Sequence, residues 1–184
     1  MHRIVFFPFF LISSLIIALT PLLSKAQSTV LNHYVQKLDP KDLEGKWYLN
    51  MSTSKTWTHT KIKDVTFTFQ PGTGYWQEDI AYLKKGKSKK IHAIEIPAGA
   101  SSIKEHRDKG MFAKRRTWYV VAMGDDKRWM VVYYGKKLSG HESLAVLSKS
   151  GKLEDADKAE LDRLFKENFF LHAKSKKIKN ISRP

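Results

Sequence analysis

Short runs of alternating apolar and polar residues, separated by turn residues, occupy the chain between residues 47 and 147. The segment Val65-Thr66-Phe67-Thr68-Phe69 alternates strictly with a period of two residues, which is typical of a strand with one buried face. Pro and Gly mark the turns, as in segment 70–74. We expect strands over 47–50, 65–69, 75–83, 91–96, 101–105, 116–123, 128–134 and 142–147.

Eight strands joined by short connections permit few folds. The connections leave no room for crossover helices, so the sheet is predicted to be antiparallel. Eight antiparallel strands can close into an up-and-down barrel, which removes exposed edges and can hold one small ligand. A two-sheet sandwich is the alternative that the strand pattern leaves open.

A change of period follows the last expected strand. In segment 153–170, Leu161, Leu164 and Phe165 share one helical face, and acidic residues gather in the first turn, where they suit the helix dipole. This pattern predicts an α-helix packed on the outside of an all-β barrel.

The two ends of the chain differ in character from its middle. A basic start, an apolar run over 4–23 and Ser24-Lys25-Ala26 predict a secretory signal peptide, 1–26, and hence a secreted or periplasmic protein. An uncleaved membrane anchor is the alternative. We expect an N-terminal leader over 27–42, one barrel domain over 43–173 and a basic flexible tail over 174–184.

Composition excludes several kinds of chemistry. The chain has no cysteine, which rules out disulfides, thiol catalysis, cysteine-ligated zinc and a lipoprotein anchor. Its histidines show no metal-ligand spacing, and no nucleophile elbow, phosphate loop or carboxylate pair is evident, so we predict no catalytic residue, metal or cofactor. The net charge of +15 favours anionic partners. Asn50 and Asn180 begin glycosylation sequons, which matter only in a eukaryotic secretory route.

Two motifs give the chain a family resemblance. Gly45-x-Trp47-Tyr48 opens the expected barrel, and Val146-Leu147-Ser148-Lys149 closes it before the helix. Together they resemble the lipocalin family, closest to bacterial outer-membrane lipocalins and their apolipoprotein D relatives, over about 43–170. The resemblance implies that Trp47 plugs the closed end, that Gly45 lets the chain pass close by, and that Lys149 replaces the usual arginine over the tryptophan. The family's middle motif is degraded to Met123-Gly124-Asp125.

The resemblance also implies which loops surround the open mouth of the barrel. These are the loop around Trp57 and the loops 84–90, 107–114 and 135–141. The last three are rich in basic residues, with Arg115 and Arg116 adjoining, which predicts a basic mouth; the members are Lys84, Lys85, Lys87, Lys89, Lys90, Arg107, Lys109, Lys114, Lys136 and Lys137.

Alternation and the family's register together predict the inward face. It includes Val65 and Ala122 as well as the candidate ligand-binding residues, which are Phe67, Phe69, Trp118, Val120, Met130, Val132, Tyr134 and Arg116. An apolar interior with a cation and a hydroxyl near the mouth suits a fatty acid or other lipid, whose carboxylate would lie at Arg116. The alternative is a barrel filled by its own side chains.

Three functions therefore compete. The first is a monomeric protein that binds a small hydrophobic, anionic ligand without chemistry. The second is a module that binds an anionic membrane surface or a polyanion through its basic rim, with the barrel as scaffold. The third, an isomerase or cyclase on a lipocalin-like barrel, rests on analogy alone. The aromatic content resembles a barrel core, so nucleic acid is not an expected partner.

Overall fold

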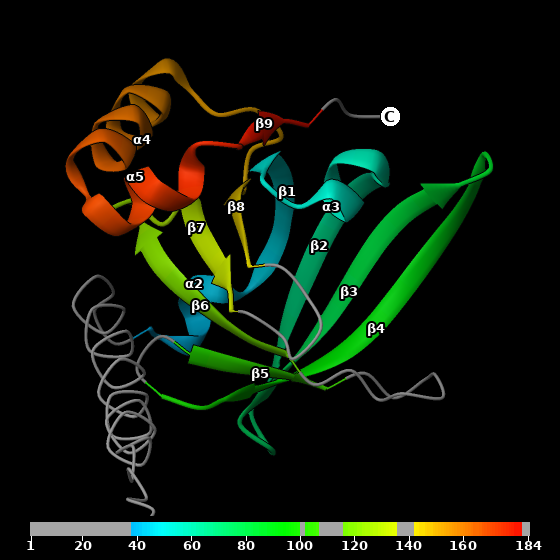
Figure 1. The fold of residues 1–184 in the computed structure, drawn as a ribbon. Coiled ribbons are helices and arrows are strands. Elements are labelled where there is room, and N and C mark those ends of the chain that lie inside the picture. Colours follow the sequence, from blue (N-terminus) through cyan, green and yellow to red (C-terminus); the bar gives the residue numbers. More distant parts are fainter. Residues whose placement is uncertain (1–37, 100–101, 107–115, 136–141, 182–184) are drawn as a thin grey trace, which may run out of the picture. The chain divides into compact units, whose positions relative to one another are not determined.

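In the computed structural model, the chain forms a closed antiparallel ring of eight strands (Figure 1). The structure describes residues 38–99, 102–106, 116–135 and 142–181, all of which lie in one compact unit, Val35–Pro184. The strands are β1 (Gly45–Ser52), β2 (Lys61–Gln70), β3 (Tyr75–Lys84), β4 (Lys87–Pro97), β5 (Ser102–His106), β6 (Arg116–Met123), β7 (Trp129–Tyr134) and β8 (Ser143–Ser148). Consecutive strands pair, and β1 closes the ring by pairing with both β8 and β2. The barrel prediction is confirmed, and the sandwich alternative is wrong.

Strand β1 sets the register of the closed ring. Trp47 lies opposite Val65 on β2, and Leu49 lies opposite Leu147 on β8. All four residues are buried and belong to the core cluster that lines the inside of the ring. Because side chains alternate along a strand, this register directs Trp47 and Leu49 inward, and the register with β8 then shifts between Leu49 and Met51.

The hairpin between β3 and β4 differs from the expected basic loop over 84–90. Lys84 pairs with Lys87, and only Lys85 and Gly86 form the turn, both with positive φ (52° and 73°). Two residues in this left-handed region make the tight turn that matches strand twist. Lys87, Lys89 and Lys90 therefore lie on β4, and the β3–β4 hairpin projects beyond the other strands (Figure 1).

A β-bulge in β6 corrects one inward-facing prediction. The register with β7 shifts between Val120 and Ala122, so that Ala122 pairs with Val131 and Met123 pairs with Met130. Ala122 is buried but lies outside the interior cluster, whereas Met123 packs against that cluster. The extra residue in the bulge explains why strict alternation fails here.

Short helices occupy the connections near β1. Helix α2 (Pro40–Leu43) overlaps the end of the expected leader, and its N-cap Asp39 accepts a hydrogen bond from the Lys41 backbone N–H. Helix α3 (Lys55–His59) lies within the segment that we expected to be loop only, between β1 and β2. Its N-cap is Ser54, and it buries Trp57.

The predicted C-terminal helix is present in two pieces. Helix α4 (Asp155–Glu167) ends at Asn168, which becomes the N-cap of α5 (Phe169–Ser175). The Asn168 side chain accepts a hydrogen bond from the Leu171 backbone N–H at 2.9 Å, which fixes the break. Both helices lie outside the ring, beside β7 and β8 (Figure 1).

The expected flexible tail, 174–184, is structured as far as Ile181. Strand β9 (Lys179–Asn180) pairs with the end of β1, where Met51 faces Asn180. Ile181 donates its N–H to the Asn50 carbonyl at 2.8 Å and packs against the core cluster. The prediction overlooked Ile178 and Ile181 as residues that a basic segment can bury.

Candidate ligand-binding interior and its two ends

The inside of the ring is lined mainly by apolar and aromatic side chains. Along the strands, the side chains that point inward alternate with side chains that point outward, and the inward ones form the interior cluster. The buried members of the cluster from the strands are Trp47, Leu49, Ile62, Val65, Phe67, Trp76, Ile80, Ile103, Trp118, Val120, Met130, Val132, Ala145 and Leu147. Phe69 and Tyr134 are partly buried against them.

Aromatic rings connect the mouth of the barrel to its interior. Trp57 on α3 contacts Tyr134 edge-on, with ring centroids 5.2 Å apart. Tyr134 contacts Trp118 at 6.2 Å, and Trp118 contacts Phe67 at 5.9 Å. Such offset and edge-on pairs add to the stability gained from burial. Trp57 therefore covers a continuous row of rings that runs inward from the open end.

Two glutamates are buried among these apolar residues. Glu95 on β4 is fully buried, and its Oε2 accepts a hydrogen bond from Trp118 Nε1 at 2.9 Å. Glu78 on β3 is 4 % exposed and alternates with Trp76 and Ile80 of the interior cluster. Because Trp76 pairs with Glu95 and Glu78 pairs with Ala93, the carboxylates occupy diagonal positions on adjacent strands.

These carboxylates correct one prediction. The interior is not purely apolar below the mouth, because Glu78 and Glu95 are buried there. The alternation of Trp76, Glu78 and Ile80 was the available signal, since it places a glutamate on the same face as two large apolar residues.

The structure brings most of the predicted ligand-binding residues together. Phe67, Trp118, Val120, Met130 and Val132 are buried in the interior cluster. Phe69 and Tyr134 pack against its edge, Phe69 with its ring 5.7 Å from that of Trp76. Arg116 begins β6 opposite Glu105, but its side chain lies outside the described residues. Contact of these residues with a ligand stays a prediction.

The closed end is organised around Trp47. Its ring is fully buried, and Nε1 donates a hydrogen bond to the Leu43 carbonyl at 2.7 Å. The Lys149 ammonium lies 5.1 Å from the ring centroid, within the range of a cation–π contact. Gly45 has a φ of 103°, a conformation that residues with a side chain rarely adopt. The geometry agrees with the roles that the resemblance implied for Trp47 and Lys149. The implied close passage at Gly45 is not seen, because a Cβ there would meet no atom within 4 Å, and the positive φ is what favours glycine.

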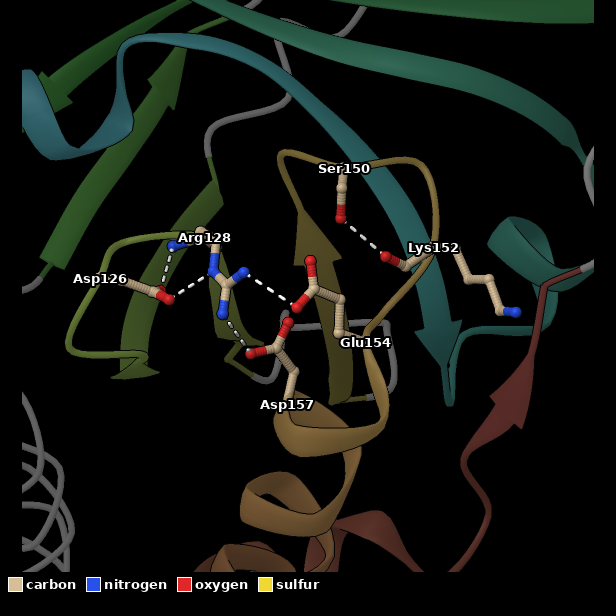
Figure 2. Close-up of polar contacts among 6 residues, drawn as sticks. All are labelled: Asp126, Arg128, Ser150, Lys152, Glu154 and Asp157. Atoms are coloured by element: carbon tan, nitrogen blue, oxygen red, sulfur yellow. Dashed lines mark hydrogen bonds and ion pairs between the residues drawn. The ribbon is translucent and has the colours of Figure 1, made fainter.

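A second cluster fastens the closed end to α4. Figure 2 shows the Arg128 guanidinium directed at three carboxylates, Asp126 in the β6–β7 turn and Glu154 and Asp157 at the start of α4. The Glu154 contact is 3.0 Å and the Asp157 contact is 3.5 Å. The Arg128 backbone N–H and side chain both bond Asp126, which lowers the pKa of that carboxyl below its ordinary value of 3.8.

The turn beside Arg128 explains the degraded middle motif. A Cβ on Gly124 would lie 2.6 Å from Trp129 Nε1, closer than side chains allow. The turn therefore requires glycine where Trp129 packs across it, whatever the family's usual residues are. The cluster was missed because two of the acidic partners of Arg128, Glu154 and Asp157, are distant from it in sequence.

The open end is basic where it is described. Lys84, Lys85, Lys87, Lys89 and Lys90 are all exposed on the β3–β4 hairpin. A cavity of about 460 Å³ lies beside the β2–β3 turn, where Thr73, Tyr75 and His92 are among its lining residues. A second cavity, of about 330 Å³, lies at the open end. It is lined by His59, Lys61, Leu83, Lys85 and Gly86, between α3 and the hairpin. The basic residues predicted on loops 107–114 and 136–141 lie outside the described residues.

Other kinds of site were sought in the same residues. Among residues 38–99, 102–106, 116–135 and 142–181, no group of three acidic or histidine side chains could hold a metal ion. Within those ranges, no helix has the length and apolar character needed to cross a bilayer. The predicted signal peptide lies in 1–37, outside the described residues.

Comparison with solved structures identifies the class of fold. Insecticyanin from the tobacco hornworm Manduca sexta superposes with a TM-score of 0.68 at 16 % identity, covering 82 % of this chain and 83 % of that one. Lobster apocrustacyanin A1 gives 0.62 at 12 % identity, covering 85 % of each chain. The cockroach allergen Per a 4 gives 0.62 at 15 % identity, covering 81 % and 90 %. No protein-family model matches the sequence, and no curated protein matches it.

The fold is therefore lipocalin-like: an eight-strand antiparallel ring with a C-terminal helix outside. At these identities the likeness is one of fold, and it distinguishes neither the bacterial outer-membrane branch nor the apolipoprotein D-like branch. The interior described above occupies the position where such a ring can hold a small ligand.

Proposed function

We propose that this protein binds a small hydrophobic ligand inside the barrel and carries it without chemical change. The observation that carries the proposal is the apolar and aromatic interior of the closed ring, which begins beneath Trp57 at the open end. Removing apolar surface from water supplies about 0.8 kcal/mol per buried CH₂, enough for moderate affinity from a lipid tail alone. Trp57 and Tyr134 would have to move aside for such a tail to enter.

The ligand is proposed to be anionic, such as a fatty acid. The buried Glu78 and Glu95 disfavour a carboxylate deep in the barrel, so the acidic head belongs at the open end. Lys61 and Lys85, which are exposed at this end, support this placement. Arg116, at the start of β6, is the further candidate for the head group.

Binding is tested by titrating the purified protein with oleate and following tryptophan fluorescence and thermal stability. At a ligand concentration of about 100 times Kd, binding should add roughly 2.7 kcal/mol to the free energy of unfolding. Ala145→Leu fills the interior and should weaken oleate binding by about tenfold or more. Ala122→Leu is the matched control, since Ala122 is buried outside the interior cluster. Equal affinities for both variants would contradict an interior site.

The head group is tested by comparing oleate with oleyl alcohol. Arg116→Ala, Lys61→Gln and Lys85→Asn should weaken binding of the acid and leave binding of the alcohol unchanged. Asparagine is chosen because Lys85 has a positive φ, which asparagine tolerates. Equal losses for acid and alcohol would contradict an ionic head-group site while leaving the interior site intact.

The exposed lysines of the β3–β4 hairpin favour a second candidate function. In it, the basic rim binds a polyanion or an anionic membrane, and the barrel is only a scaffold. This function predicts a steep fall in heparin and vesicle binding with rising salt. Binding that does not change with salt would exclude it.

A further inference from the structure

We propose that the outer face of α5 docks on an anionic lipid bilayer, through a surface separate from the basic rim. This docking face consists of Phe169, His172, Ala173 and Lys176, which lie at positions i, i+3, i+4 and i+7 and therefore share one side of the helix. All four residues are exposed. None of them takes part in the interior or the closed end described above.

Phe169 is the most unusual member of the docking face. It is 88 % exposed, whereas the adjacent Leu171 is buried. The Asn168 cap fixes the start of α5. It therefore also fixes the backbone position of Phe169, the first residue of the helix. An aromatic side chain that is exposed at a fixed position suits the interfacial zone of a bilayer, where aromatic residues are enriched.

The opposite side of α5 is fastened to the barrel. The Phe170 ring lies edge-on to Tyr133 at 5.1 Å, and Lys174 forms an ion pair with Glu142. Burial, and then the charge of Glu142, raise the pKa of Tyr133. Because these contacts hold the inner side, the docking face can meet a membrane without any unfolding of the helix.

Charge at the C-terminal end of the docking face favours an anionic surface. No acidic residue follows Glu167, and Lys176, Lys177 and Lys179 are exposed next to the helix. Each lysine near an anionic leaflet adds to binding, within the reach set by salt screening. A lipid surface explains both the lysines and Phe169, whereas a soluble polyanion explains the lysines alone. Because α5 is short, the attachment should be reversible.

Segment 176–180 also places this surface near the mouth. Strand β9 pairs with Met51 and Ser52, the last residues of β1 before α3. The C-terminal end of α5 and the open end of the barrel therefore lie toward the same end of the ring (Figure 1). Docking does not depend on ligand binding.

Binding is measured by co-sedimentation with vesicles of phosphatidylcholine, with and without phosphatidylglycerol. The protein should bind only the mixed vesicles. Phe169→Ala should weaken that binding about fivefold to tenfold, and neutralising Lys176 and Lys177 together with glutamine should weaken it roughly 30-fold. Tyr75→Ala, which removes an exposed aromatic on β3, and the pair Lys84→Gln with Lys87→Gln on the hairpin are matched controls. Unchanged binding in the α5 variants, with loss in the hairpin variant, would overturn the proposal in favour of the rim.

A second readout separates lipid from polyanion and locates the contact. Since the chain has no cysteine, Ala173→Cys and Ser88→Cys each give a single labelling position for a polarity-sensitive fluorophore. The label at 173 should shift to the blue on mixed vesicles, and the label at 88 should not. Heparin binding should be insensitive to Phe169→Ala. A shift at 88 alone, or heparin binding without vesicle binding, would overturn the proposal.

Discussion

The closed and open ends of the barrel are built on different principles. At the closed end, Trp47 is fully buried, bonded to Leu43 and covered by Lys149, and Arg128 ties the adjoining turn to α4. At the open end, Trp57 lies on a short helix between strands, beside exposed lysines and a basic cavity. The comparison teaches that stability is concentrated at one end and access at the other.

The largest expected effect is at the closed end. Trp47→Ala removes one of the largest fully buried side chains of the described residues and leaves a cavity, so we expect a loss of about 3–5 kcal/mol in the free energy of unfolding. Urea denaturation followed by circular dichroism measures it. A loss below that for Trp57→Ala would break the comparison, because stability would then reside at the mouth.

Trp57→Ala should have a smaller effect on stability and a larger effect on access. Trp57 is 9 % exposed and contacts Tyr134 from outside the strands, so we expect a loss of about 1–3 kcal/mol. Removing the Trp57 ring should also uncover Tyr134 at the open end and so speed ligand dissociation. Stopped-flow fluorescence with oleate measures that rate. Trp57→Phe is the conservative control. Slower or unchanged dissociation in Trp57→Ala would contradict a covering role.

Lys149 sharpens the account of the closed end. Lys149→Ala removes the cation above Trp47 and should cost about 0.5–1 kcal/mol of unfolding free energy. Lys149→Arg should keep or increase stability, since a planar guanidinium can stack on the ring. The same urea titrations report both changes. If Ala and Arg at position 149 gave equal stability, the contact would carry no energy.

Asp126 gives the smallest effect, which is visible as a dependence on pH. Its pKa is lower in the folded than in the unfolded chain, so the carboxylate stabilises the fold above about pH 3.8, and this contribution is lost as the pH falls through the folded value. Asp126→Asn should therefore be less stable than the wild type at neutral pH, and the difference should disappear in acid. Thermal unfolding across pH measures it, with Asp125→Asn as the charge-matched control. A difference that persists unchanged in strong acid would contradict this origin.

The sequence was most informative where a residue acts through its own strand. The strict alternation at 65–69 identified a strand with Val65 and Phe67 inside, and Gly45, Trp47 and Lys149 fell where the family resemblance placed them. These positions depend on local period and short motifs. The strand positions could be predicted from the period alone, whereas the contact of Lys149 with the distant Trp47 was predicted only through the family motif.

Other features depend on contacts that a single sequence does not reveal. The bulge that turns Ala122 out of the interior is set by pairing with β7, and the strand at 179–180 exists because β1 offers it an edge. The Asn168 cap that divides the C-terminal helix, and the Arg128 cluster that joins the β6–β7 turn to α4, also depend on the folded arrangement. Asn50 illustrates the same limit, because its side-chain amide bonds Ser148 across the sheet at 2.7 Å, where a glycan on the sequon would displace it.

The most direct test of the carrier proposal is native mass spectrometry of the purified protein, followed by extraction of any bound small molecule. We predict a mass adduct that is released on denaturation and identified as a hydrophobic molecule with an acidic head, and that is lost in Ala145→Leu but kept in Ala122→Leu. A protein that carries no adduct and gains none when mixed with oleate or oleyl alcohol would contradict the proposed binding in the interior.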